Sequence, residues 1–128
     1  MQIVSALFID EIELRAVPGP STRIDLTGIQ FSAPASEPFP LTITPHLVVI
    51  VRNGVGEDPN GVLEVVFVRD GEQIARNVQP VDVEPGKFAY RLVRGELEFD
   101  EPGTVEAQCR IGSGDPTIVP YTLLPPVA

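Results

Sequence analysis

The stretch GVLEVVFVRDGEQIAR, residues 61–76, decides the fold of this chain. A run rich in β-branched residues, Val62 to Val68, is followed by Asp70-Gly71 and by a second short run, Glu72 to Arg76. This order predicts a β-hairpin with a type I′ turn, because Gly adopts the positive φ that the turn requires and Asp tolerates it. Apolar residues alternate onto both faces of the first run, which predicts a central strand buried on both sides. One face is expected to hold Leu63, Val65 and Phe67, and the other Val62, Val66 and Val68.

The rest of the chain shows further strand patterns and no capped helix. Strands are expected over residues 2–15, 22–31, 41–52, 87–94, 96–100, 104–111 and 117–124, separated by turns that contain Pro and Gly. Residues 2–15 also fit a helical stripe, but they lack an N-cap and are rich in isoleucine, so a strand is favoured. Pro45 cannot donate to a ladder, so the paired part of its strand is expected to begin near His46.

Three segments carry more specific expectations. Ile24 and Leu26 are expected to point inward, and Gly28 to mark a bulge where the strand changes face. Residues 32–40 and the chain after Arg76 are expected to be irregular connections. Short strands and frequent turns together predict a single all-β domain over residues 1–128. The favoured architecture is an antiparallel β-sandwich, immunoglobulin-like in size, and a small β-barrel is the alternative.

The composition narrows the class of partner. Asp and Glu number 18 against 9 Lys and Arg, which gives a formal charge of −9. A surface of that sign repels phosphate, so we expect no nucleic-acid partner. No apolar stretch approaches the length of a membrane span, and Asp10 and Glu11 interrupt the first apolar run before a signal peptide could form. These features predict a cytoplasmic protein without a membrane partner.

Four short motifs resemble a loosely defined bacterial family of small all-β proteins of unknown function. They are the opening strand Ser5-Ala6-Leu7-Phe8-Ile9-Asp10, the return strand Ile24-Asp25-Leu26-Thr27-Gly28, the segment Pro38-Phe39-Pro40-Leu41 and the late turn Phe99-Asp100-Glu101-Pro102-Gly103. In this chain Thr104 or Val105 stands where that family usually has an aromatic residue. The resemblance implies a β-sandwich and carries no activity or site residue.

The candidates for nucleophilic catalysis are few. His46 is the single histidine, so a hydrolase would have to use it with Cys109 or a serine. No serine lies in a G-x-S-x-G elbow. His46 is interpreted as an ordinary strand residue. Alternation along its strand predicts that Cys109 points inward, so Cys109 is interpreted as a small buried hydrophobic residue. A hydrolase is therefore the least favoured function.

Acidic residues offer the remaining candidates for ligand binding. Two His or Cys residues in total exclude a zinc site, and no cofactor is expected. Calcium takes carboxylates and carbonyls from loops. The candidate groups are the loop Glu57-Asp58-Pro59-Asn60-Gly61, the Asp100-Glu101 turn, and Asp10, Glu11 and Glu13. No D-x-D-x-D-G loop occurs, so solvated acids are the favoured interpretation. Glu96, Glu98, Asp100 and Glu101 form an acidic strand edge that protects against aggregation or docks a basic partner.

These observations lead to a prediction of a non-catalytic domain for protein–protein interaction or structural assembly, with a protein partner or a homo-oligomer. A calcium-dependent or small-ligand binding module is the alternative. Several apolar residues need cover that one sandwich core does not supply, so a closed barrel or another subunit is expected to provide it. They are Val48, Ile50, Val62, Val66 and Val68.

Overall fold

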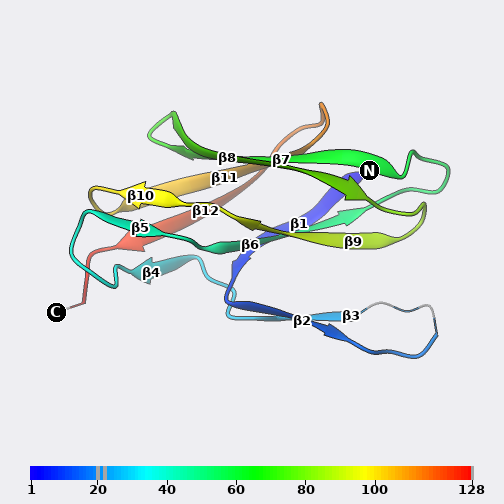
Figure 1. Cartoon of the computed structure of the whole chain (residues 1–128), viewed down its shortest axis with the longest axis horizontal. Coiled ribbons are helices and arrows are strands. Elements are labelled where there is room, and N and C mark those ends of the chain that lie inside the picture. Colours follow the sequence, from blue (N-terminus) through cyan, green and yellow to red (C-terminus); the bar gives the residue numbers. More distant parts are fainter. Residues whose placement is uncertain (20, 22, 128) are drawn as a thin grey trace.

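A computed structural model describes residues 1–19, 21 and 23–127, which form twelve strands and no helix. Figure 1 shows how these twelve strands are arranged in the molecule. They are β1 (Gln2–Ile9), β2 (Glu11–Arg15), β3 (Arg23–Thr27), β4 (Ser32–Pro34), β5 (Leu41–Ile43), β6 (His46–Arg52), β7 (Asn60–Arg69), β8 (Glu72–Asp82), β9 (Phe88–Arg94), β10 (Leu97–Phe99), β11 (Gly103–Ile111) and β12 (Thr117–Leu124). The fold is therefore all-β, as predicted. No described helix has the length and hydropathy that a transmembrane span requires.

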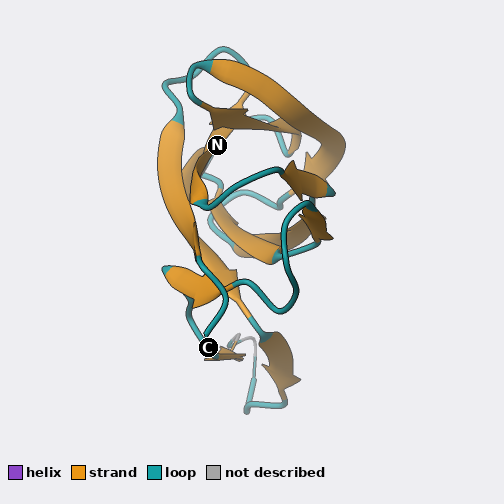
Figure 2. Ribbon diagram, turned by 90° about the vertical axis from the view of Figure 1, so that its left-hand side faces the viewer, coloured by secondary structure: helices purple, strands orange, loops and turns teal. Residues whose placement is uncertain are grey.

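Two layers of strands make a sandwich. One layer is a five-stranded sheet in the order β4–β12–β11–β7–β8. The facing layer contains a three-stranded sheet, β1–β6–β9, and the short pair β10–β5, which continues β9 and β6 along the chain. Figure 2, which views the molecule end on, shows these strands around a common interior, with the β2–β3 hairpin outside it at the bottom.

The sandwich does not close into a barrel, because no ladder joins the edge strands β8 and β9 among the described residues. Side chains bridge the two edges instead. The Arg91 Nε–H donates to the carbonyl of Pro80 at 3.2 Å, and the Gln79 amide donates to the carbonyl of Leu92 at 3.4 Å. Arg91 also donates from Nη1 to the carbonyl of Tyr90 at 2.9 Å. These bonds occupy edge carbonyls that a further strand would need for pairing.

The opening stretch forms the hairpin that its sequence predicts. Asp70 and Gly71, with φ of 51° and 79°, turn β7 directly into β8, as a type I′ turn requires. Leu63, Val65 and Phe67 are fully buried on the inner face. The prediction of burial on both faces is wrong, because Val62 on the outer face is 50% exposed.

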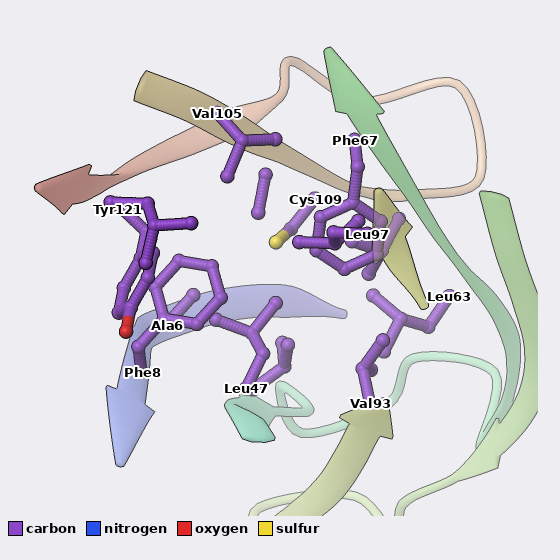
Figure 3. Close-up of a cluster of buried hydrophobic side chains, with 14 of the residues drawn as sticks. Ala6, Phe8, Leu47, Leu63, Phe67, Val93, Leu97, Val105, Cys109 and Tyr121 are labelled. Atoms are coloured by element: carbon purple, nitrogen blue, oxygen red, sulfur yellow. The ribbon is translucent and has the colours of Figure 1, made fainter. Parts of the chain in front are cut away.

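The core lies between the layers and draws its side chains from both. Phe67, Cys109 and Val105 of the five-stranded sheet meet Leu47 and Val93 of the three-stranded sheet (Figure 3). The Phe8 and Tyr121 rings join the layers near one end, with centroids 5.1 Å apart. The strand predicted for residues 104–111 is confirmed as β11, and its residues Val105, Ala107 and Cys109 are fully buried.

Three segments differ from the sequence-based prediction. The second strand of the hairpin continues to Asp82 and contains Pro80, which is tolerated because β8 is an edge strand. Residues 32–34, expected to be irregular, form β4 and pair in parallel with β12. Gly28 does not form a bulge inside a strand. It follows the end of β3, where its φ of 68° turns the chain back toward the sandwich.

The segment 2–15 is extended, as predicted, but it forms two strands that belong to different parts of the molecule. β1 pairs with β6 in the sandwich, whereas β2, after a break at Asp10, pairs only with β3. Ile24 and Leu26 lie on β3 and are half-buried, outside the sandwich core, so the prediction that they point into the core is wrong. Thr22 and Pro20, predicted to lie in a strand and a turn, are outside the described residues.

Candidate functional site

The β2–β3 hairpin, called the arm below, is amphipathic. The register pairs Ile12 with Leu26 and Leu14 with Ile24, which places these four apolar side chains on one face. The charged residues lie on the other face, where Arg15 pairs with Arg23 across the strands. An isolated two-stranded hairpin is marginally stable in water. The apolar face of the arm therefore needs a surface to pack against.

The root of the arm is held by several contacts. The Asp10 N–H donates to the carbonyls of Thr27 and Gly28, both at 3.0 Å, and the Gln30 N–H donates to the carbonyl of Phe8 at 2.8 Å. The Gln30 side-chain amide donates to the Asp10 carboxylate. Position 28 admits only glycine without strain, because its φ is positive and a Cβ there would collide with the Asp10 carboxylate. These contacts set the direction in which the arm leaves the sandwich.

The outer face of the three-stranded sheet lies opposite the arm. Alternation along β6 and β9 places Ile50, Phe88, Tyr90 and Leu92 on this face, away from the core. Val48 is also on the outer face, yet it is fully buried. Ile12 of the arm lines a small hollow together with His46 and Leu92, so the root of the arm lies beside this end of the sheet.

Away from its root the arm does not close onto the sheet. A groove of about 610 Å³ separates Leu14 and Ile24 of the arm from Ile50 and residues 88–92 of the sheet. Large apolar side chains are left in contact with water on both walls: Leu14 is 64% exposed, Phe88 53% and Leu92 46%. The groove is larger than four other hollows of the described residues, which measure about 300 to 470 Å³.

The charge of the sheet wall is opposite to that of the whole chain. Strands β1, β6 and β9 contain three arginines, Arg52, Arg91 and Arg94, and no Asp or Glu. Arg52 and Arg94 lie on the outer face, whereas Arg91 has the opposite phase and bonds the carbonyls of Pro80 and Tyr90. The wall therefore carries a charge of +2 with His46 neutral, in a chain whose formal charge is −9. At the open end of the groove the Arg52 guanidinium carbon lies 5.9 Å from the centroid of the Phe88 ring. This cation–π contact places a positive charge beside the apolar wall.

The polar face of the arm holds a cluster of ion pairs. The Asp25 carboxylate accepts hydrogen bonds from Arg15 Nε at 2.5 Å and from Arg23 Nε at 3.1 Å. The hydrogen bonds from Arg15 and from Arg23 lower the pKa of Asp25 below its usual value, and the Arg15 bond has the larger effect. Exposed ion pairs contribute little to stability, so this cluster aligns the two strands of the arm more than it stabilises them.

His46 and Cys109 are not brought together. His46 is half-buried on the outer side of β6, where it lines a hollow of about 300 Å³ with Asp10, Gln30 and Tyr121. No hydrogen bond joins His46 to another side chain within the described residues. Cys109 lies in the core between the sheets, and burial raises the pKa of its thiol to about 12 (Figure 3). A thiol with that pKa is almost entirely protonated at neutral pH and is a poor nucleophile.

The three candidate calcium groups lie apart. Glu57 and Asp58 follow β6 at one end of the sandwich, whereas Asp100 and Glu101 follow β10 at the other end (Figure 1). Glu57 Oε2 accepts hydrogen bonds from the Met1 ammonium at 2.9 Å and from the Gly54 N–H at 2.8 Å, and both interactions lower its pKa. Across residues 1–19, 21 and 23–127, no three His, Cys, Asp or Glu side chains form a cluster that could hold a metal ion.

The acidic strand edge has a structural function on its inner side. Leu97 and Phe99 of β10 are fully buried, so the strand anchors the core while Glu98 points outward. Arg69 covers this strand: its Nη1 donates to the Glu98 carbonyl at 2.9 Å, and its guanidinium carbon lies 5.0 Å from the centroid of the Phe99 ring. Glu98 lines a hollow of about 470 Å³ together with polar residues such as Ser36 and Glu37, in contrast to the apolar groove between the arm and the sheet.

Sequence reasoning identified Val48 and Ile50 as residues that need cover, but it missed the groove. Two patterns in the sequence indicate its walls: the alternating apolar residues of β2 and β3, and Phe88, Tyr90 and Leu92 at every second position of β9. No protein-family model matches the chain, and no curated protein has a similar sequence.

Proposed function

We propose that this protein is a non-catalytic interaction or assembly domain that binds a polypeptide in the groove between the arm and the three-stranded sheet. The observation that carries this proposal is the open groove of about 610 Å³ between two apolar walls. A contiguous exposed apolar surface marks an interaction site more often than isolated apolar residues do. The bonds at the root of the arm support the same function, since they hold one wall in position before a partner arrives.

The chemistry of the walls specifies the kind of partner. Aromatic and large aliphatic side chains, here Phe88, Tyr90 and Leu92, favour apolar contact at the centre of an interface. Arg52 and Arg94, which share the outer face of the sheet, favour a partner segment that carries carboxylates beside its apolar residues. Among the described residues that line the groove there is no nucleophile and no carboxylate pair, which favours binding over catalysis.

A small apolar molecule is the second candidate occupant. The volume of the groove, about 610 Å³, falls within the range of ligand pockets in proteins. Against this candidate, the groove is open along its length, and Leu14 and Phe88 remain more than half exposed. A ligand there would stay largely in water.

Native mass spectrometry of the protein isolated gently from its own source tests the proposal. We expect the chain of 13.8 kDa to appear together with another polypeptide, either a further copy or a foreign subunit. The Leu92→Glu variant, altered in the groove, is expected to lose that partner. The Ile118→Glu variant carries the same change on the opposite outer face, where Ile118 is 50% exposed, and is expected to keep it.

Two results would contradict the proposal. One is a bare monomer, or a monomer that carries only a small molecule or calcium. The other is a complex that survives Leu92→Glu and is lost in Ile118→Glu, because the partner would then bind the five-stranded sheet.

A further inference from the structure

We infer that the polypeptide segment bound in the groove is a short extended run of apolar residues that ends in an Asp or Glu beside Arg52. This inference rests on the proposed function and specifies the chemistry of the partner. The groove has two apolar walls, one formed by Leu14 and Ile24 of the arm and the other by Ile50 and residues 88–92 of the sheet. Figure 1 shows the arm extended below the sheet, and a segment in the groove lies between these two layers.

The presence of two walls determines the residue pattern of the bound segment. Side chains of an extended chain point alternately to opposite sides. A segment that contacts one apolar surface therefore alternates apolar and polar residues, whereas a segment between two apolar surfaces is apolar at every position. Leu14 is 64% exposed on one wall and Phe88 is 53% exposed on the other. Both rows of side chains of an apolar run would thus cover surface that is in contact with water.

The size of the groove favours an extended segment over a helix. The sheet wall from Phe88 to Leu92 spans about 13 Å at a rise of ~3.3 Å per residue. Over that length an α-helix of ~10 Å diameter would occupy about 1,000 Å³. The groove holds about 610 Å³. An extended chain covers the same length with about five residues.

Arg52 supplies a positive charge at one end of the groove. It pairs with Phe88 in the register of β6 and β9, and its guanidinium carbon lies 5.9 Å from the centroid of that ring. Among the described residues, no carboxylate forms an ion pair with Arg52. The Glu57 carboxylate, in the loop after β6, accepts hydrogen bonds from the Met1 ammonium and the Gly54 N–H instead. An acid at the end of the bound segment can therefore pair with Arg52.

Fluorescence anisotropy with three labelled synthetic peptides tests this inference, each kept below the concentration at which the free peptide self-associates. They are SGVLVLVEGS, its alternating form SGVSVSVEGS and its uncharged form SGVLVLVQGS. We expect the first to bind most tightly. The alternating peptide should bind at least about tenfold more weakly, because it leaves one wall uncovered. The uncharged peptide should bind about two- to fivefold more weakly, the factor that an exposed ion pair contributes.

Variants of the two walls show whether the peptide lies between them. Leu14→Ser should reduce the preference for SGVLVLVEGS over the alternating peptide at least about threefold, because it makes the arm wall less apolar. Arg52→Glu should reverse the charge preference, so that a peptide with Lys in place of Glu binds best. Leu14 and Arg52 are exposed, so neither substitution disturbs the core, and thermal unfolding checks this. Ile118→Ser, on the opposite outer face, is the matched control and should change neither preference.

Three peptide results would overturn the inference: equal binding of the apolar and alternating peptides, equal binding of the Glu and Gln peptides, or preferences that Leu14→Ser and Arg52→Glu leave unchanged. A dimer of the purified chain that Leu92→Glu dissociates would also overturn it, because a second copy would then occupy the groove. If no peptide binds while the protein from its source carries a polypeptide that Leu92→Glu removes, the inference fails and the proposed function stands.

Discussion

On the outer face of the five-stranded sheet, exposed apolar side chains alternate with polar ones, whereas on the three-stranded sheet they lie next to each other. Val78 faces Glu64 in the register, Ile118 faces Gln108, and Arg76 pairs with Glu64 at 2.6 Å. On the three-stranded sheet, Ile50 faces Tyr90 and no acid is present. The first face can remain in water as it is, while the second exposes a contiguous apolar surface beside the arm.

The largest effect on stability is expected at Val48, which is fully buried on the outer face of the three-stranded sheet. Val48→Ala should lower the free energy of unfolding by about 1.5–2 kcal/mol, because it removes two fully buried carbon groups worth ~0.8 kcal/mol each. Val62→Ala, at a half-exposed position on the other outer face, should cost less than half as much. Urea unfolding measures both. Equal losses would mean that the two outer faces do not differ in cover.

The exposed part of the same face should bind an apolar fluorescent dye. At a dilution where any dimer has dissociated, we expect Leu92→Glu to abolish most of the dye fluorescence, since it places a charge in the groove. Ile118→Glu should leave the fluorescence close to that of the wild type. Loss of dye binding in Ile118→Glu instead would show that the five-stranded sheet carries the larger apolar surface.

A smaller effect is expected for the ion pair that separates apolar residues on the five-stranded sheet. A double-mutant cycle with Arg76→Ala and Glu64→Ala should give a coupling energy of about 0.2–1 kcal/mol, because both side chains are partly exposed to solvent. Arg76 and Glu101, which share no contact, provide a control cycle with no coupling. A coupling well above this range would mean that the face depends on the pair.

The smallest effect is expected on the arm itself, from the protonation of Asp25. Its pKa lies below the usual value of 3.8, because Arg15 and Arg23 stabilise the carboxylate. Because its pKa is lowered in the folded arm, the Asp25 carboxylate stabilises the arm at pH values above 3.8. This stabilisation is lost as the pH falls through the lowered pKa. The NMR amide signals of Leu14 and Ile24 should therefore change at a pH below the pKa of a free aspartate side chain. The Thr122 amide on β12 monitors global unfolding, and Asp25→Asn should remove the arm transition.

Much of the sandwich could be predicted because alternation and turn chemistry act locally. Asp70-Gly71 specifies its hairpin through φ alone, and the alternation through Val105, Ala107 and Cys109 states which side is buried. Two misses have a different cause. Pro80 suggested a break, but only the position of β8 at a sheet edge makes this proline acceptable. β4 exists because it pairs in parallel with the distant strand β12.

The amino-acid sequence alone determined the all-β class, the main hairpin and the assignment of side chains to faces, because each depends on neighbours along the chain. What each face meets was decided only by the tertiary structure. Ile24 and Leu26 alternate as core residues do, yet the bend at Asp10 and the turn at Gly28 place them outside the sandwich. The groove arises because Leu14 and Leu92, far apart in sequence, are brought to opposite walls by folding. Periodicity shows which residues share a surface, and only the packing of the elements shows whether that surface is filled.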